Sequence, residues 1–164
     1  MSFSRVHSAT LYGLEVKVIQ VEADLRNGLP SFHMVGYLSS EVKEAGERVR
    51  TAILNSGMNL PPIKTVINLS PANIRKKGAL FDLPIALAIL ASLGKVEEEK
   101  IKHTLVIGEL GLDGRVRKVN GVLPIVAKAK ELGFTTCILP KENEREAIII
   151  EGIRIIGVSS LKEL

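Results

Sequence analysis

The sequence has few of the side chains on which disulfide, metal and thiol chemistry depend. Its 164 residues include one cysteine, three histidines and no tryptophan. The single Cys137 cannot form an internal disulfide, which is typical of proteins from a reducing compartment, so a cytoplasmic location is expected. The three histidines, at positions 7, 33 and 103, are far apart in the sequence, and no His or Cys pair has the spacing of a metal site. A structural zinc site is therefore not expected.

Long apolar runs and phosphate-binding motifs are also missing. No apolar run reaches the ~18–20 residues that cross a bilayer, and the N-terminus lacks the apolar stretch of a secretory signal, so no membrane partner is expected. The pattern G-x-x-x-x-G-K-[ST] does not occur, which excludes a P-loop for ATP. Aromatic residues make up only 4% of the chain, which argues against a platform for stacking bases. No cofactor or metal is expected in this chain.

The composition that remains is that of a globular protein. Apolar residues account for 46% and charged residues for 24% of the chain, and the length fits one domain spanning residues 1–164. The net charge of +4 comes from 22 Lys and Arg against 18 Asp and Glu. Spread over a whole domain, this excess is too small to indicate a partner.

Apolar periodicity predicts both strands and helices, and hence an α/β (α+β) fold with a mixed sheet. Alternation indicates half-buried strands over residues 5–23 with a turn at Tyr12-Gly13. Further strands are expected over 31–36, 65–69, 104–107 and 135–139, and a hairpin over 148–156. Helices are expected over 40–55, 82–93 and 122–132, with a helix or linker over 159–164.

Two of these helices differ in their surroundings. The first carries Lys43, Glu47, Arg48 and Arg50 on one face, which we interpret as solvated surface. The second is apolar on nearly every side, so it is expected in the centre of the core, with Asp82 as its N-terminal cap.

Positive charge is concentrated in two short segments. Residues 70–80 contain three cations and no acid, and residues 113–118 contain three cations and one acid. Such cations can grip successive phosphates of a nucleic acid, although they can equally be solvated turns or contacts between subunits. The six candidate phosphate-binding residues are Arg75, Lys76, Lys77, Arg115, Arg117 and Lys118.

Three blocks of the sequence, taken together, resemble a known family. They are residues 68–90 (NLSPANIRKKGALFDLPIALAIL), 108–125 (GELGLDGRVRKVNGVLPI) and 28–57. They closely resemble the N-terminal domain of magnesium-chelatase-like AAA+ ATPases, the competence-associated family of bacterial proteins. Phe81-Asp82-Leu83-Pro84 following Lys77-Gly78 is a specific marker, and the resemblance covers essentially the whole chain.

This resemblance implies a role in DNA processing rather than in inserting magnesium into porphyrins. Members act as hexameric ATPases, some of them as branch-migration helicases during natural transformation. The resemblance therefore implies single-stranded or branched DNA as partner and self-association, as a hexamer, in a longer protein. The ATP and magnesium sites would belong to an ATPase domain downstream of this chain.

The same blocks also look like the proteolytic domain of Lon protease, which implies a Lon-like fold. In that protease a serine nucleophile and a lysine base form the catalytic dyad. The resemblance places Ile85 at the serine position and Ile125 at the lysine position. Because neither side chain can attack a carbonyl or accept a proton, we expect a non-catalytic domain whose former cleft is filled by isoleucines.

Two alternatives use other residues or none. A residual peptidase could use Ser70 and Lys128, provided that the two side chains come within hydrogen-bond reach. A purely structural oligomerisation module would need no ligand at all. Sedimentation and gel-shift measurements distinguish this module from a DNA-binding domain.

Overall fold

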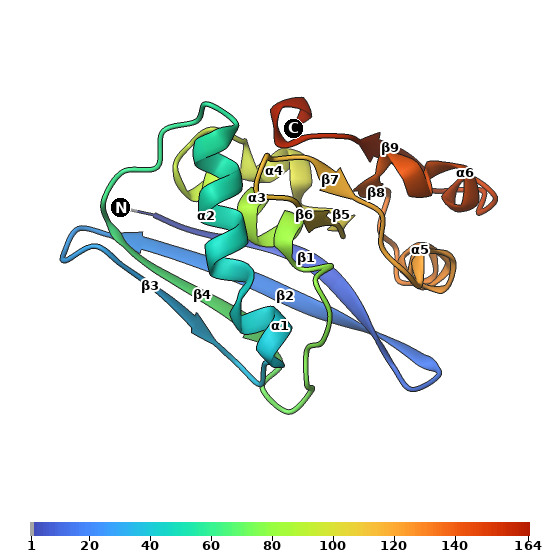
Figure 1. Ribbon diagram of the computed structural model, residues 1–164. Helices are drawn as coiled ribbons and strands as arrows, with labels where there is room; N and C mark the ends of the chain where they lie inside the picture. Colours follow the sequence, from blue (N-terminus) through green and yellow to red (C-terminus); the bar gives the residue numbers. More distant parts are fainter. Residues whose placement is uncertain (1) are drawn as a thin grey trace.

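Two long antiparallel strands form the middle of the sheet in the computed structural model, which describes residues 2–164 (Figure 1). They are β1 (Ser2–Tyr12) and β2 (Glu15–Arg26), and they pair along their whole length. Gly13 closes the turn between them with φ 64°, a conformation that glycine adopts without strain. The predicted pair of strands over 5–23 and its turn are confirmed.

Five further strands complete a seven-stranded mixed sheet in the order β3-β4-β2-β1-β5-β8-β9. β2 pairs antiparallel with β4, and the outer neighbours on both sides are parallel. A separate two-stranded ribbon joins β6 to β7. The strands beyond the central pair are β3 (Ser31–Val35), β4 (Lys64–Ser70), β5 (Thr104–Val106), β6 (Glu109–Leu110), β7 (Val116–Arg117), β8 (Thr136–Pro140) and β9 (Arg154–Val158).

The three helices that the periodicity predicts are present, one of them divided, and two short helices over 98–101 and 144–147 were not predicted. The helix expected over 40–55 is interrupted at Glu44, where the backbone leaves one short helix and starts the next. No helix within residues 2–164 is both long and apolar enough to cross a membrane. The helices are α1 (Ser40–Lys43), α2 (Ala45–Asn55), α3 (Asp82–Ser92), α4 (Glu98–Ile101), α5 (Val122–Glu131) and α6 (Glu144–Ala147), with 3₁₀ turns at Lys141–Asn143 and Leu161–Glu163.

Helices cover both faces of the sheet, so the core has two parts. Successive strand residues point to opposite faces, and the neighbours Leu105 and Val106 accordingly belong to different apolar clusters. Val106 packs in the cluster built by α2 and α3, and Leu105 in the cluster built by α5 and α6. Residues 82–90 of α3 are all buried, which confirms the predicted central helix.

The hairpin predicted over 148–156 is wrong. The chain instead turns after α6, and Gly152, at φ 85°, leads it into β9. β9 then pairs parallel with β8, from Thr136 opposite Arg154 to Pro140 opposite Val158. The free edge of β8 offers a complete hydrogen-bonding partner, whereas a local hairpin would stand alone in water, where a two-stranded ribbon is marginally stable.

Candidate nucleic-acid interface

The first basic segment is a loop fixed against the start of α1. Backbone hydrogen bonds run from the Lys76 N–H to the Tyr37 carbonyl and from the Ser39 N–H to the Lys76 carbonyl, each at 2.9 Å. The Ser39 hydroxyl also accepts the Val42 N–H and caps α1. These contacts hold the loop backbone in one position, so its side chains have defined directions.

In that position the three cations of the loop differ in their exposure to solvent. Arg75 and Lys77 are exposed, whereas the side chain of Lys76 is buried, with 0% of its surface accessible. The Lys76 ammonium donates a hydrogen bond to the Pro71 carbonyl, and burial lowers its pKa. Predicting Lys76 as a phosphate contact was therefore wrong, because its ammonium points into the protein and a phosphate outside cannot reach it.

Replacing Lys76 by methionine tests this structural role. Methionine fills a similar volume and removes a charge that burial disfavours, so the free energy of unfolding is expected to stay the same or rise by about 1 kcal/mol. Chemical denaturation measures it. DNA affinity is expected to be unchanged. A loss of DNA affinity in a variant that still folds would show that Lys76 does contact phosphates.

The second basic segment surrounds the ribbon of β6 and β7. Its turn is attached to the end of α2, where the Asn55 side-chain amide donates to the Leu112 carbonyl at 2.8 Å. Gly114, at φ 87°, packs against Ser56 so closely that a Cβ there would lie 2.2 Å from the Ser56 hydroxyl oxygen. The turn thus requires glycine, and it fixes the direction of the strand that carries Arg115 and Arg117.

All three cations of this second segment are exposed. Arg115 has 81% of its side chain accessible and lies 3.7 Å from the Asp113 carboxylate. Arg117 and Lys118 are exposed as well. A hollow beside the ribbon is lined by Asp113, Arg115, Val116, Arg117, Lys141, Glu142 and Ser159.

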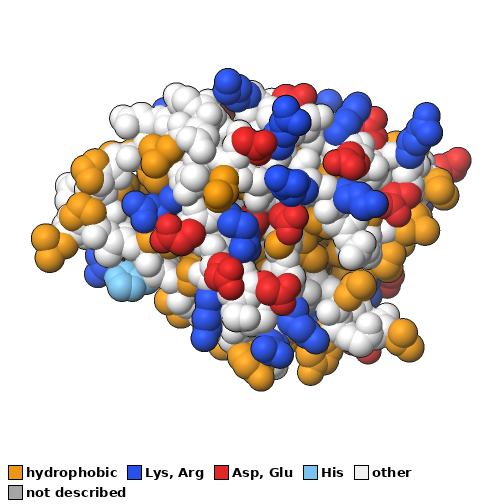
Figure 2. Space-filling view, in the orientation of Figure 1, with side chains coloured by type: hydrophobic (Ala, Val, Ile, Leu, Met, Phe, Trp, Pro, Cys, Tyr) orange, Lys and Arg blue, Asp and Glu red, His pale blue; other side chains and the backbone are white. Residues whose placement is uncertain are grey.

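The structure brings the two basic segments to different places. The loop with Arg75 and Lys77 touches the start of α1, and the ribbon turn touches the end of α2. The hypothesis that both border one former catalytic face as a single basic surface is not supported, because the α1–α2 stretch lies between them. In the view of Figure 2, Lys and Arg side chains are interspersed with Asp and Glu rather than gathered in one patch.

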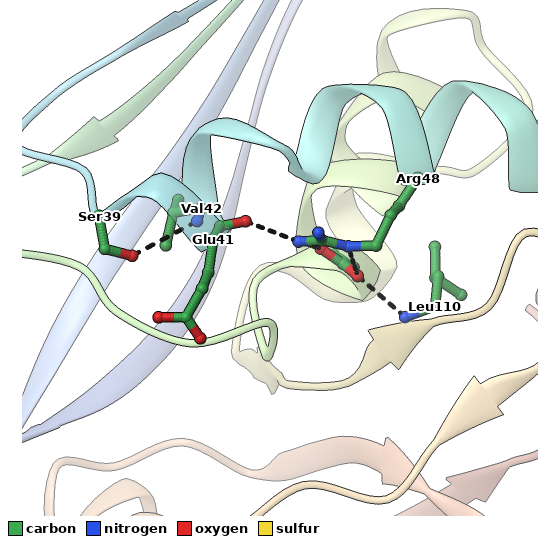
Figure 3. Close-up of polar contacts among 6 residues, drawn as sticks. Ser39, Glu41, Val42, Arg48 and Leu110 are labelled. Carbon is green, nitrogen blue, oxygen red and sulfur yellow. Dashed lines mark hydrogen bonds and ion pairs between the residues drawn. The ribbon is translucent and has the colours of Figure 1, made fainter.

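Between these two segments lies an ion pair that the sequence interpretation missed, with a fully buried acid and a partly exposed arginine. Arg48 on α2 donates two hydrogen bonds to the Asp82 carboxylate, at 2.8 and 3.0 Å (Figure 3). Asp82 also accepts the Leu110 N–H at 3.0 Å, and Arg48 donates to the Glu41 carbonyl at 2.8 Å. The pair therefore joins α1, α2, α3 and β6.

The sequence pattern predicts simpler roles for both partners. Arg48 lies on the face interpreted as solvated, and Asp82 was expected to cap its helix, but its side chain makes no cap bond and is 0% exposed. Burial raises the pKa of Asp82, and the Arg48 guanidinium and the Leu110 N–H counteract that rise. An acid at the first position of an otherwise apolar and buried helix was the signal in the sequence, because a buried carboxylate needs a partner.

The two positions assigned to the protease dyad are both buried, but they do not meet. Ile85 belongs to the cluster of α2 and α3, and Ile125 to the cluster of α5 and α6 on the other face of the sheet. The expectation that they jointly fill one cleft is therefore wrong.

The alternative dyad has no contact either. Ser70 ends β4 opposite Gln20, whereas Lys128 lies 3.5 Å from Glu131 on α5. No hydrogen bond in the described part of the chain joins Ser70 to Lys128. Within the same residues, no three His, Cys, Asp or Glu side chains are grouped to hold a metal ion.

Comparison with known proteins identifies the family. The family described as subunit ChlI of Mg-chelatase matches residues 21–143, three quarters of the chain. The chain belongs to this family. It is 41% identical over 152 residues to the uncharacterized protein YifB of Escherichia coli K12, and 36% identical over 150 residues to the competence protein ComM of Haemophilus influenzae. These matches cover 93% and 92% of this chain but only 30% and 29% of the relatives.

The chain is also similar to a protease. Lon protease 2 of Bacillus subtilis is 32% identical over 128 residues, covering 76% of this chain and 22% of the protease. With the mixed sheet and its helices, this similarity confirms the predicted Lon-like α/β fold. The chain spans about a third of the length of the family relatives it matches, so it corresponds to one part of each of them.

Proposed function

We propose that this chain is a non-catalytic DNA-binding and assembly domain of a magnesium-chelatase-like AAA+ ATPase that processes DNA. The match to a competence protein supports a role in natural transformation, and the resemblance of the sequence to branch-migration helicases suggests branch migration as the step. The ATP and magnesium sites belong, in this proposal, to a further ATPase domain, because this chain has no P-loop. Single-stranded or branched DNA is the expected partner, and the whole protein is expected to be hexameric.

One observation carries the DNA-binding part of the proposal. Five of the six candidate cations are exposed, and in the described residues only Arg115 of these five has an ion-pair partner. Charges without a carboxylate partner are available to neutralise phosphates, and each such contact releases counterions from DNA. The binding is expected to be independent of sequence and strongly salt-dependent.

Charge reversal at these positions tests the proposal. A variant with Lys77→Glu, Arg117→Glu and Lys118→Glu is expected to lose at least tenfold in affinity for a fluorescent single strand and for a four-way junction, measured by anisotropy. Each lost phosphate contact should also reduce the slope of log affinity against log salt by about 1.

A matched control is Lys102→Glu. Lys102 is exposed and ends α4, just before β5 begins, whereas the ribbon follows the end of β5. Its reversal changes the net charge by the same amount as Lys77→Glu alone, so comparing these two single variants isolates the effect of position. Equal affinity in the triple variant and the parent chain would place the DNA site elsewhere or remove it.

The non-catalytic part of the proposal has its own test. The purified chain is expected to leave casein and short peptides intact. Hydrolysis that is lost on Ser70→Ala or Lys128→Ala would contradict it and establish a peptidase.

A further inference from the structure

The outermost strand on one side of the sheet has a hydrogen-bonding edge that faces solvent. Within residues 2–164, β3 pairs only with β4, on its inner side (Figure 1). The Ser31 N–H donates to the Ile63 carbonyl where this pairing begins, at 3.5 Å. Because the backbone groups of successive strand residues point to alternate sides, those of Phe32 and Met34 face away from β4. The outer edge of β3 therefore offers N–H donors and carbonyl acceptors to another extended chain.

The edge on the other side of the sheet is protected. The Val116 N–H of the ribbon donates to the Ser159 carbonyl directly after β9 ends, at 2.8 Å, and β9 itself begins with the charged residue Arg154. Charged side chains and proline are the usual means by which an edge strand avoids pairing with other chains. β3, with the sequence SFHMV, contains neither Lys, Arg, Asp, Glu nor Pro. Of the two edges, β3 is therefore the one suited to receive a further strand.

A small apolar pocket lies at the start of this edge. Its walls are the first residues of β3, the second half of α2 and the loop that joins α2 to β4. Gly46 of α2 lies against the Phe32 ring, where a Cβ would be 2.9 Å from the ring carbons, so this wall of the pocket is fixed by close packing. In the view of Figure 2, hydrophobic side chains gather at this end of the molecule. Six apolar residues line the pocket: Pro30, Phe32, Leu54, Leu60, Pro61 and Pro62.

The size and the charge of the pocket indicate its occupant. Its volume is about 210 Å³. Pockets for cofactors and other small molecules usually have roughly 300–1,000 Å³, so this one suits a single apolar side chain better than such a ligand. Arg50 is an exposed residue of the same pocket and forms no ion pair in the described part of the chain. An acidic group of a partner can therefore pair with it.

We propose that β3 binds an extended peptide segment of another protein as an added strand. Main-chain hydrogen bonds to the outer edge hold the segment extended. Alternate side chains of a strand point to the same face of the sheet, so an apolar side chain on the α2 side enters the pocket beside Phe32. An acidic side chain on that same face of the segment pairs with Arg50. Sheets recognise peptides in this way, with the main chain giving affinity and a pocket giving specificity.

This inference goes beyond the proposed DNA-binding function and uses a different part of the surface. The pocket contains none of the six candidate cations. It includes Thr65, near the start of β4, whereas the loop with Arg75 and Lys77 follows the end of β4 at Ser70. Its apolar lining also suits a peptide side chain rather than the phosphates of DNA.

Peptide display followed by binding measurements tests the proposal. The probe is a phage library of random peptides of about eight residues, long enough to run along β3. The library is selected against the 164-residue chain. The selected peptides are expected to share an apolar and an acidic residue two positions apart. A fluorescent synthetic copy is expected to bind the parent chain, and Leu54→Asp and Arg50→Glu are each expected to weaken this binding at least tenfold, measured by anisotropy.

Two control variants match these changes. Leu132→Asp alters a leucine that is 50% exposed, against 53% for Leu54, and Lys43→Glu reverses an exposed cation; both residues lie outside the pocket. Both variants are expected to bind the peptide like the parent chain. Loss of binding in the controls equal to that in the pocket variants overturns the proposal.

A backbone-methylated copy of the peptide tests strand addition itself. It keeps every side chain but lacks alternate N–H donors, and it is expected to bind at least tenfold more weakly. Hydrogen exchange at the Phe32 and Met34 amides is expected to slow when the unmodified peptide binds. Unchanged affinity after methylation together with unchanged exchange overturns the proposal, because the peptide is then held by its side chains alone.

The remaining outcomes separate this proposal from other occupants and from the proposed function. A library that yields no binder overturns it. Self-association of the chain that Leu54→Asp abolishes also overturns it, by assigning the edge to a second copy. A loss of DNA affinity in Leu54→Asp and Arg50→Glu alike overturns it by assigning the pocket to DNA. Peptide binding by a chain without DNA affinity sustains this inference and rejects the DNA-binding function.

Discussion

Replacing Arg48 by alanine is expected to lower the free energy of unfolding by about 3–5 kcal/mol. Among the described residues, the substitution leaves the Asp82 carboxylate, which is 0% exposed, with the Leu110 N–H as its remaining hydrogen-bond partner. Removing one member of a buried ion pair is costly because the other charge stays buried without compensation. The loss removes the polar link of α2 to α3 and β6 but leaves their apolar packing, so the unfolding transition should remain cooperative and move to lower denaturant concentration.

Arg50→Ala is the control for this prediction. Arg50 lies on the same helix and is exposed, so the same change of residue type is expected to cost little. Urea denaturation followed by circular dichroism gives both values. If Arg48→Ala and Arg50→Ala unfold at the same urea concentration, the pair does not stabilise the fold.

The Arg48→Ala loss should depend on pH in a definite direction. Burial raises the pKa of Asp82, so the folded chain holds this proton more tightly than the unfolded chain does. Stability linked to this group is therefore gained as the pH falls through the raised pKa. With Arg48 gone, the destabilisation is expected to shrink between neutral pH and mildly acidic pH, where the carboxyl becomes neutral.

The second large effect is expected at the two isoleucines that occupy the positions of the protease dyad. Ile85→Ala and Ile125→Ala should each cost about 2–5 kcal/mol, because both side chains are 0% exposed and truncation leaves a cavity. Equilibrium denaturation measures each loss. A loss below about 1 kcal/mol at either position would mean that the surrounding side chains collapse into the space.

A milder pair of substitutions tests whether the two isoleucines share a cleft. Ile85→Val and Ile125→Val are expected to cost about 0.5–1.5 kcal/mol each. Because the residues belong to different clusters, the double variant should show the sum of the two losses within about 0.5 kcal/mol. A larger interaction energy would show that they are coupled through a common space.

Local patterns in the sequence were sufficient for most of the elements. The alternation through Val16 and Val18 predicts β2, and the unbroken apolar run after Asp82 predicts a helix buried on all sides. Residues 148–156 show the limit of this reasoning. Three isoleucines before a Glu-Gly turn favour a hairpin locally. In the structure, β9 pairs instead with the edge of β8, where it completes a larger sheet. The local sequence of residues 148–156 contains no sign of this edge, because another segment of the chain forms it.

For the candidate site residues, too, some properties follow from local sequence and others only from the tertiary structure. The sequence by itself determined that this is an α/β chain without a P-loop and that its cations are concentrated in two segments, because composition and motif spacing are local properties. The Lon-like form of that fold was implied by the resemblance to Lon protease. Only the tertiary structure decided which cations face water, since Lys76 and Lys77 are neighbours with opposite burial. It also decided that Arg48 reaches Asp82, 34 residues away, and that the two basic segments lie apart. Which side chains form ion pairs and which are buried depend on how distant segments of the chain pack together, and no local stretch of sequence determines that packing.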